Sequence, residues 1–365
     1  MKFLKLKNKF ATLISSFCAV LATSCFAFRT PSIFKTISCD LGVMAAKTVF
    51  SNGNSDSLAQ DSLEENKNTN TGSSENENAQ SGDNKPDSQS AKEQPDPEEA
   101  ERHKNEKTYK ITESQCKSGG EKYENFYFKN GTNHKINVLE ELKKPLKIKV
   151  AKDGTPQVLI VHTHTSEAYM LKDYGFYYES YNPRSSNNAR NVVAVGEEIK
   201  NGLMERGINT IHDQTPHDSP SYNGSYNRSA ETIKGYLKEF PSINVVLDIH
   251  RDSMGGIKPT FLYNGEKAAQ IMLLVGCDRN NSKDFPDWKE NLSFALKLQK
   301  TAEDTFPNMT RPMTLEYVRY NMNLTPASLL IEVGTELNTV KEACTTGRLL
   351  AKSTAKVIDS LQEAD

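Results

Sequence analysis

The sequence predicts an α/β fold: a single catalytic domain with a mostly parallel, twisted sheet flanked by helices, placed after a disordered linker. Two observations lead to this prediction. From residue 156 onward, short apolar runs alternate with longer segments of helical periodicity, an order typical of a sheet covered by helices on both faces. Between about residues 51 and 107, large apolar side chains almost vanish, which indicates a segment without a core.

The bulk composition limits the classes of function. The chain has 365 residues and a formal net charge of −2, which allows one large domain or two small ones. A net charge near zero gives no argument for nucleic-acid binding, and we expect no nucleic-acid partner. Six cysteines without a Cys-x-x-Cys pair argue against a disulfide framework and a cysteine-ligated zinc site, so we expect buried free thiols. They are Cys18, Cys25, Cys39, Cys116, Cys277 and Cys344.

Residues 1–28 have the pattern of a membrane-targeting segment. Four lysines within residues 2–9 precede an apolar run from Phe10 to Phe28, which is long enough for an export signal or a thin transmembrane helix. Residues 22–25 weakly resemble a lipobox, and a signal peptidase site is a further alternative. We predict an uncleaved single-pass anchor in the cell membrane, with the rest of the chain outside the cytoplasm.

We assign residues 29–107 to a disordered polar linker and residues 108–365 to the catalytic domain. The linker is dominated by Ser, Asn, Glu, Asp, Gln and Lys, a composition that cannot offset the entropy of ordering. It would give the domain reach from the membrane. Phe126–Phe128 and Leu146–Val150 are strand-like, and they belong either to a small lead-in subdomain or to the first strands of the main sheet.

The remaining elements alternate regularly. The predicted strands are Val158–Val161, Ile208–Ile211, Ile243–Ile249, Ile271–Val275 and Leu329–Ile331. The predicted helices span residues 191–206, 229–240, 292–302 and 340–361. In the first helix, apolar side chains recur on one face, and Gly207 stands where a C-cap is expected. Pro241 ends the second helix.

Three of these strands run into polar residues. The first leads into His162–Glu167, the third into Asp248–Asp252 and the last into Glu332–Thr335. The carboxyl ends of the strands of an open α/β sheet line the ligand crevice. The sequence therefore predicts a functional site at this edge.

The residue types favour a metal site. His164 and Glu167 form an H-x-x-E pair whose spacing lets both side chains reach one ion, and His250 supplies a third ligand from a distant strand. Catalytic zinc sites use three N/O ligands and leave a position for water. Glu332 then suits the general base, which takes a proton from water and passes it to the leaving amine. Zn²⁺ is the expected cofactor, although these ligands also suit other divalent ions.

Several neighbouring residues have two interpretations. His162 and His164 would point the same way on an extended strand, so either could be the ligand; the H-x-x-E spacing favours His164 and leaves His162 as a transition-state stabiliser or a residue behind the ligands. Arg251 either pairs within its loop or binds a substrate carboxylate. Asp252 either forms that pair or orients a ligand.

Two loops rich in Tyr and Asn favour substrate binding, although ordinary turn chemistry also explains them. The first contains Tyr222 and Arg228, and the second, just before the last strand, contains Asn321. We expect the other histidines to be hydrogen-bonded structural residues. These are His134, His212 and His217.

Long motifs in a fixed order resemble the stage II sporulation protein P family over roughly residues 125 to 360. The segments that carry this resemblance are Val158–Tyr169, Asn191–Gly196, Ser221–Ser229, Asp248–Asp252 and Leu330–Gly334. The basic anchor, polar linker and extracytoplasmic domain are also similar to that family's layout.

The resemblance implies a zinc-dependent N-acetylmuramoyl-L-alanine amidase whose fold is similar to that of the third amidase family. It also implies an endopeptidase activity on the stem peptide, and peptidoglycan as substrate. It further implies a role in forespore engulfment, at the septal or forespore membrane, with sporulation stage II proteins D and M. One departure stands out. Relatives in the third amidase family take a Glu ligand from just before the helix after the first strand, whereas Ser185–Arg190 contains no carboxylate. We expect Glu167 to replace it, as in zinc carboxypeptidases.

A second hypothesis belongs to another class. The chain would be a catalytically inactive scaffold that binds peptidoglycan and recruits a partner hydrolase. The complete set of His164, Glu167, His250 and Glu332 argues against it, because a scaffold has no need of all four.

Overall fold

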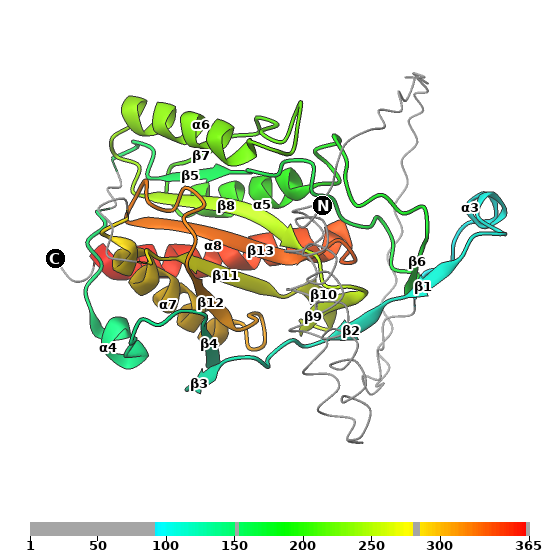
Figure 1. Cartoon of the computed structure of the whole chain (residues 1–365), viewed down its shortest axis with the longest axis horizontal. Coiled ribbons are helices and arrows are strands. Elements are labelled where there is room, and N and C mark those ends of the chain that lie inside the picture. Colours follow the sequence, from blue (N-terminus) through cyan, green and yellow to red (C-terminus); the bar gives the residue numbers. More distant parts are fainter. Residues whose placement is uncertain (1–91, 150–152, 280–284, 363–365) are drawn as a thin grey trace, which may run out of the picture.

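A twisted eight-stranded sheet forms the centre of the domain (Figure 1). The computed structural model describes residues 92–149, 153–279 and 285–362. In spatial order the strands are β3 (Glu121–Tyr123), β4 (Phe126–Asn130), β12 (Met313–Glu316), β11 (Ile271–Gly276), β13 (Ala327–Thr335), β8 (Val245–Asp252), β5 (Val158–Val161) and β7 (Thr210–His212).

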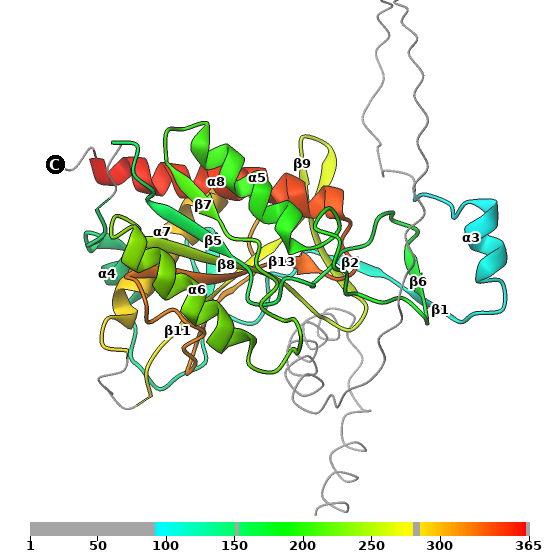
Figure 2. The ribbon, with the colours of Figure 1, turned by 90° about the horizontal axis from the view of Figure 1, so that it is seen from above.

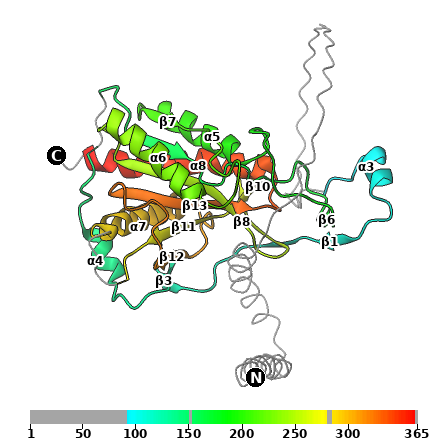
Figure 3. The same cartoon turned by 45° about the horizontal axis from the view of Figure 1, so that its top comes forward.

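Most neighbours in this sheet are parallel, which confirms the predicted α/β class. Strands β13, β8, β5 and β7 form one continuous parallel block. Strands β4, β12 and β11 form a second parallel block. The two blocks meet at the antiparallel pair β11–β13, and β3 is antiparallel to β4 at the far edge. Figure 3 shows β8, β13 and β11 side by side through the middle of the domain.

Helices cover both faces of the parallel block. Helices α5 (Val192–Met204) and α8 (Val340–Gln362) pack on each other on one face, and α6 (Ser225–Glu239) lies on the other (Figure 2). Alternation along β5 explains this: Val158 and Ile160 belong to the main core, whereas Leu159 and Val161 pack with residues of α6. All four are completely buried, as expected for a strand with helices on both sides. Helix α7 (Trp288–Thr305) packs along β11, β12 and β4, and α4 (Val138–Lys143) packs on α7.

Local sequence sets the helix ends. The Asn191 side chain accepts a hydrogen bond from Val193 N at 3.0 Å and so caps α5. Gly207 adopts φ 74° after that helix, as the prediction required. Helix α6 begins at Ser225, four residues earlier than predicted, directly after Gly224 at φ 84°. The first turn of this helix is polar, so apolar periodicity does not reveal it. Its residues border the site described below.

The N-terminal part of the described chain extends along one end of the domain (Figure 1). Strand β1 (Thr108–Lys110) pairs with β6 (Phe176–Tyr178), and β2 (Thr112–Ser114) joins the hairpin of β9 (Ile257–Tyr263) and β10 (Glu266–Ala269). Between the two pairs, Ile111 is 2% exposed and packs with Met170 and Leu337. The N-terminal segment is thereby fixed both to the loop after β5, through β6, and to β9, the strand that follows β8.

The structure adds a short helix in the range assigned to the linker and, among the residues it describes, lacks one of the predicted strands. Helix α3 (Pro97–Arg102) lies inside the range assigned to the linker; Asp96 caps it by accepting a hydrogen bond from Glu99 N at 2.8 Å. A capped start with proline in the first turn favours a helix here, and Tyr174 OH donates a hydrogen bond to Glu99 on it. Residues 146–149 form no strand, although their apolar residues alternate. The first 28 residues, assigned to an anchor, lie outside the described residues.

Two further sequence expectations concern membranes and thiols. Within the described ranges, no helix has both the length and the apolar character needed to cross a bilayer. Cys116 and Cys277 are free and buried as predicted, and Cys344 is free and half-buried. The three other cysteines lie outside the described residues.

A buried lysine holds the N-terminal strands, the loop after β5 and α8 together. Lys258 is fully buried, and its Nζ lies 2.8 Å from both Asp173 Oδ2 and Glu342 Oε1. Lys258→Met should lower the free energy of unfolding by roughly 3–5 kcal/mol, because it leaves the buried Glu342 without its cation and Asp173 with Lys267 alone, at 3.0 Å. Urea denaturation measures this change.

Lys341 provides the matched control. It pairs with Glu266 at 3.4 Å, and both side chains are mostly exposed. Lys341→Met should change the unfolding midpoint little, since exposed pairs contribute little to stability. Equal effects of the two substitutions would show that the buried pairs at Lys258 do not hold the segments together.

Candidate active site at the ends of strands β5, β8 and β13

The three strands that end in polar residues are direct neighbours in the sheet. Strand β8 lies between β5 and β13, and the register pairs Glu332 with His250 and Val161 with Asp248. After Val161 the chain leaves the strand and turns, with Glu167 N bonded to His164 O at 3.1 Å. The predicted convergence of polar strand ends is therefore confirmed.

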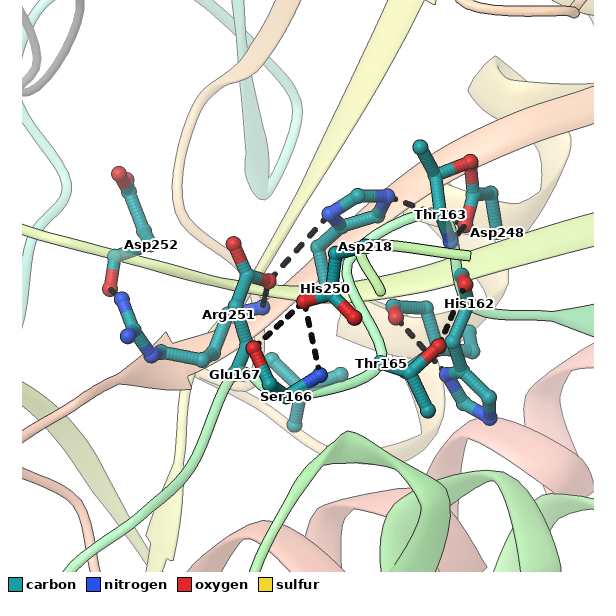
Figure 4. Close-up of polar contacts among 12 residues, drawn as sticks. His162, Thr163, Thr165, Ser166, Glu167, Asp218, Asp248, His250, Arg251 and Asp252 are labelled. Carbon is teal, nitrogen blue, oxygen red and sulfur yellow. Dashed lines mark hydrogen bonds and ion pairs between the residues drawn. The ribbon is translucent and has the colours of Figure 1, made fainter. Parts of the chain in front are cut away.

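His250 lies between two carboxylates (Figure 4). Its Nδ1 is 3.3 Å from Glu167 Oε2, and its Nε2 is 3.0 Å from Asp248 Oδ1. Burial alone would lower the pKa of this imidazole, but the charge of Asp248 and the contact with Glu167 raise it well above its usual value. Burial raises the pKa of Glu167, but the hydrogen bond and charge of His250 outweigh it and hold that pKa well below the usual value. The His250 ring is thus held between two carboxylates, with one at each ring nitrogen.

His164 lies beside this pair. Its ring stacks on Tyr222 at 4.1 Å between centroids and meets the His250 ring edge-on at 5.3 Å. Its Nδ1 is buried and has no hydrogen-bond partner among the described residues. Burial lowers the pKa of His164 to about 4, so the imidazole is neutral and keeps a lone pair for a ligand.

His162 points elsewhere, so the expectation that both histidines share one direction is wrong. Its Nδ1 lies 3.0 Å from Ile249 O, and its Nε2 lies 2.8 Å from His212 Nε2. Alternation fails because the strand ends at Val161 and the next residues form a turn. His162 supports β8 from behind, and burial together with His212 lowers its pKa to about 3.

Glu332 has an unsatisfied carboxylate. Its Oε2 is buried without a hydrogen-bond partner in the described part of the chain. Burial, and then the negative charge of Asp252, raise its pKa to about 8. A carboxyl group that titrates near neutrality can both accept and return a proton, as a general base requires.

Arg251 and Asp252 shape the site from behind. The Arg251 guanidinium donates to the carbonyl oxygens of Pro183 at 2.9 Å and Ala168 at 3.3 Å, and Arg251 N donates to Glu167 Oε2 at 3.1 Å. These bonds, together with an ion-pair contact to Glu336 at 3.9 Å, hold the loop of Glu167. The structure does not pair Arg251 with the Asp252 carboxylate, which was one of the two expected roles. Asp252 pairs with the buried Arg311 at 2.9 Å.

The three loop residues predicted to face substrate differ in their contacts. Tyr222 covers His164, and the Arg184 guanidinium lies over the Tyr222 ring at 4.9 Å. Arg228 donates through Nε to His217 O at 2.6 Å and also bonds the carbonyl of Ser221. Its guanidinium is committed to holding the loop. Asn321 likewise bonds the start of α6.

The three histidines predicted to be structural do have protein partners. His134 Nε2 lies 2.7 Å from Asp278 O, His212 Nδ1 lies 3.0 Å from Glu197 Oε2, and His217 Nδ1 lies 2.9 Å from His162 O. His217 supports the turn that precedes His164.

No individual role is predicted from the sequence for Asp248, Arg311, Tyr226 or Tyr320. Asp248 accepts hydrogen bonds from Thr163 N at 2.8 Å and Thr163 Oγ1 at 2.7 Å while it contacts His250. The signal in the sequence that could have identified Asp248 is a carboxylate inside an otherwise apolar strand. Tyr226 and Tyr320 lie in the two loops rich in Tyr and Asn, although the loop pattern did not single them out. No local pattern marked Arg311, because tertiary pairing brings it to the site.

The residue types and their burial fit a zinc site. Their side chains, however, lie close to one another only in pairs. His164 Nδ1 is buried and lacks a hydrogen-bond partner among the described residues. His250 Nε2 faces Asp248 at 3.0 Å, so Nδ1, on the side of Glu167, is the nitrogen of His250 that would bind an ion. Buried unpaired donors and acceptors are costly unless something binds them. Across residues 92–149, 153–279 and 285–362, however, no three His, Cys, Asp or Glu side chains are grouped closely enough to hold a metal ion.

Solved structures of cell-wall amidases are among those similar to this chain. An N-acetylmuramoyl-L-alanine amidase from Clostridium difficile 630 is 16% identical, with 58% of this chain and 100% of that chain covered and a TM-score of 0.34. The amidase AmiC2 of Nostoc punctiforme is 12% identical, with 59% and 99% covered and a TM-score of 0.32. At these scores the similarity carries no argument about activity.

The sequence comparisons are more specific. The stage II sporulation protein P of Bacillus subtilis (strain 168) is 28% identical over 196 residues, which are 51% of this chain and 47% of the relative. The match thus spans about half the length of that relative. The family model described as stage II sporulation protein P matches residues 40–355. The chain belongs to the stage II sporulation protein P family.

Proposed function

We propose that this chain is a zinc-dependent peptidoglycan hydrolase, an N-acetylmuramoyl-L-alanine amidase, that acts during sporulation in engulfment of the forespore. The observation that carries the hydrolase is the pairing of Glu332 with His250 across neighbouring strands, with His164 and Glu167 beside them. Family membership supports the sporulation role. The bond to be cleaved follows from the resemblance of the motifs to that family.

In this proposal His164, Glu167 and His250 hold the zinc ion. Two imidazoles and one carboxylate are a donor set that catalytic zinc accepts. When bound, the ion would polarise the amide carbonyl and make water a better nucleophile near neutral pH. Asp248 would orient His250 from the opposite side of the ring, since it already contacts Nε2 at 3.0 Å.

Glu332 then performs the proton transfers. Its carboxylate takes a proton from the attacking water and gives it to the nitrogen of the leaving L-alanine, so that the group ends as it began. The raised pKa of about 8 supports this role, because a carboxyl group that readily holds a proton can also deliver one. Arg251 keeps Glu167 in place through its backbone N–H and its bonds to the loop.

Several finer assignments belong to the same proposal. We infer an accompanying endopeptidase activity on the stem peptide, cooperation with sporulation stage II proteins D and M, and attachment to the membrane through residues 1–28. They are supported by the resemblance to the family and by the basic and apolar N-terminal sequence.

Metal removal provides the test. The full chain is incubated with purified sacculi, and new L-alanine amino termini are counted. We expect release in the presence of zinc, loss of release to the background rate after dialysis against a chelator, and recovery when zinc is added back. Zinc content is verified to be below one ion per ten chains, because about 0.1 ion per chain would leave about a tenth of the rate. Release that persists in this chelated protein would contradict metal dependence.

One observation favours the alternative of a catalytically inactive scaffold that binds peptidoglycan: no three candidate ligands are grouped closely in the described residues. The same assay separates the two functions. A scaffold would co-sediment with sacculi yet release no amino termini with zinc present, either alone or together with protein D.

A further inference from the structure

Tyr320 occupies an unusual position beside the candidate site. It lies in the turn between β12 and β13, and it adopts φ 42°, followed by Asn321 at φ 60°. Two consecutive residues other than glycine in the left-handed region are uncommon, and a bulky aromatic residue rarely adopts it. Such a conformation persists only where the surroundings impose it, and it is concentrated at functional sites.

The surroundings do fix this turn. Met322 is 1% exposed, and its carbonyl accepts a hydrogen bond from Asn291 Nδ2 at 2.6 Å. Asn321 Nδ2 donates to Tyr226 O and to Ser229 Oγ, both at 2.9 Å. The turn is thus bonded to α7 on one side and to α6 on the other, so the ring of Tyr320 is held in a defined place.

The same bonds connect the turn to His250. Ser229 Oγ lies 2.7 Å from Thr163 Oγ1, which donates to Asp248 Oδ2 at 2.7 Å. Because the Thr163 proton is used for Asp248, Ser229 is the donor to Thr163. Asp248 in turn contacts His250 at 3.0 Å. A continuous polar chain therefore relates the position of Tyr320 to that of a proposed zinc ligand.

The ring of Tyr320 completes an aromatic wall along the site. It stacks on Tyr226 at 4.7 Å between centroids, and Tyr226 meets His164 edge-on at 5.5 Å. Tyr320 is half-buried, and no hydrogen bond joins its hydroxyl to another group within the described residues. Its phenol is therefore a donor without an acceptor in the part of the chain that the structure describes.

The charges nearby keep that donor protonated. Burial and then the carboxylate of Glu332 raise the pKa of the phenol, while the charge of His250 lowers it by less. Glu332 and His250 belong to the proposed catalytic set, whereas Glu316, which also raises this pKa, does not. The stacking of Tyr320 on Tyr226, which meets His164 edge-on, is what places the phenol beside the reacting centre. Preorganised donors in such a place act on charge that develops during the reaction.

We propose that the phenol hydroxyl of Tyr320 is a further catalytic group, which donates a hydrogen bond to the carbonyl oxygen of the scissile amide as negative charge develops there. This role rests on the proposed function. The phenol keeps its proton throughout, so the transfers assigned to Glu332 are unchanged. Asn321 is a positioning residue, since it acts by holding the turn.

Tyr320→Phe tests this assignment, because it removes one oxygen and retains the ring that stacks on Tyr226. With purified sacculi and the zinc-loaded full chain, we expect kcat to fall by roughly 10²-fold, the usual effect of losing one donor of this kind. The KM should stay within about two-fold, because the bond is made mainly in the transition state. Zinc content and the thermal midpoint should equal those of the wild type.

Tyr317→Phe is the matched control. Tyr317 lies in the same connection, and its hydroxyl accepts a hydrogen bond from Asn133 N at 2.9 Å, away from the proposed catalytic residues. This variant should retain the wild-type kcat.

Each other outcome overturns the assignment. An unchanged kcat in Tyr320→Phe excludes the catalytic role, a change in KM alone makes Tyr320 a substrate-binding residue, and a loss of zinc shows that it acts through the metal. A wild-type chain that releases no amino termini would overturn the proposed function and this role with it, whereas an active wild type with an equally active Tyr320→Phe overturns this role alone.

Discussion

Replacing Glu332 with Gln is expected to reduce kcat for amide hydrolysis by roughly 10³-fold, because the amide fills the same space but cannot take a proton from water. Metal binding should be retained, since Glu332 is not among the proposed ligands. The variant and the wild type are compared by the rate of new L-alanine amino termini from sacculi, together with zinc content. A wild-type kcat in this variant would show that another group is the base.

Stability should not fall in the same variant. Burial and Asp252 raise the pKa of Glu332 to about 8, above that of an unfolded glutamate, so folding at neutral pH opposes ionisation of this group. Gln cannot ionise, so its burial carries no such cost. The thermal midpoint at pH 7 should therefore equal that of the wild type or exceed it. Glu141→Gln is the control: Glu141 is also buried, but it lies on α4 with Lys144 and Ser293 as partners. It should leave kcat unchanged.

The sequence predicts the central strands because they are apolar on both faces. Val158–Val161 and Ile271–Val275 were predicted almost at their observed bounds, and β8 and β13 differ mainly in continuing through their polar ends. Strands covered by helices on both sides need apolar residues at every position, so the pattern identifies them without knowledge of their neighbours.

The hairpin of β9 and β10 was not predicted, for an equally physical reason. Ile257–Tyr263 contains Lys258, Pro259 and Thr260, which weaken the apolar signal. Lys258 is nevertheless fully buried, because carboxylates from two distant segments surround it. Such pairing depends on tertiary contacts that no local window contains.

The same holds for the site: residues at strand ends could be predicted, and residues brought in by tertiary pairing could not. Strand ends predicted that His250 and Glu332 lie together, since neighbouring carboxyl ends meet at one edge. The choice between His162 and His164 followed from spacing, while the assumed direction of His162 was wrong because the turn begins immediately after Val161. Arg311 could not be predicted: it reaches Asp252 across β11 and β13, and that strand order is not encoded locally.

Replacing His250 with Ala should abolish hydrolysis and zinc binding, and it should also lower the free energy of unfolding by roughly 3–5 kcal/mol. The destabilisation arises because Asp248 and Glu167 are both buried and contact the ring nitrogens of His250 at 3.0 and 3.3 Å. Without it, two carboxylates remain in a poorly solvated space. Zinc content, release from sacculi and urea denaturation measure the three effects. His134→Gln, which removes an imidazole bonded to Asp278 O, should retain zinc and activity.

A second substitution separates the structural role of His250 from its chemical one. Adding Asp248→Asn to His250→Ala removes one of the uncompensated charges, so much of the lost stability should return. Activity should not return, because the asparagine restores no metal ligand and no imidazole. If the double variant regained hydrolysis, the loss in His250→Ala would have come from misfolding, and His250 would not be a ligand. If it regained stability alone, the imidazole would be required for the chemistry itself.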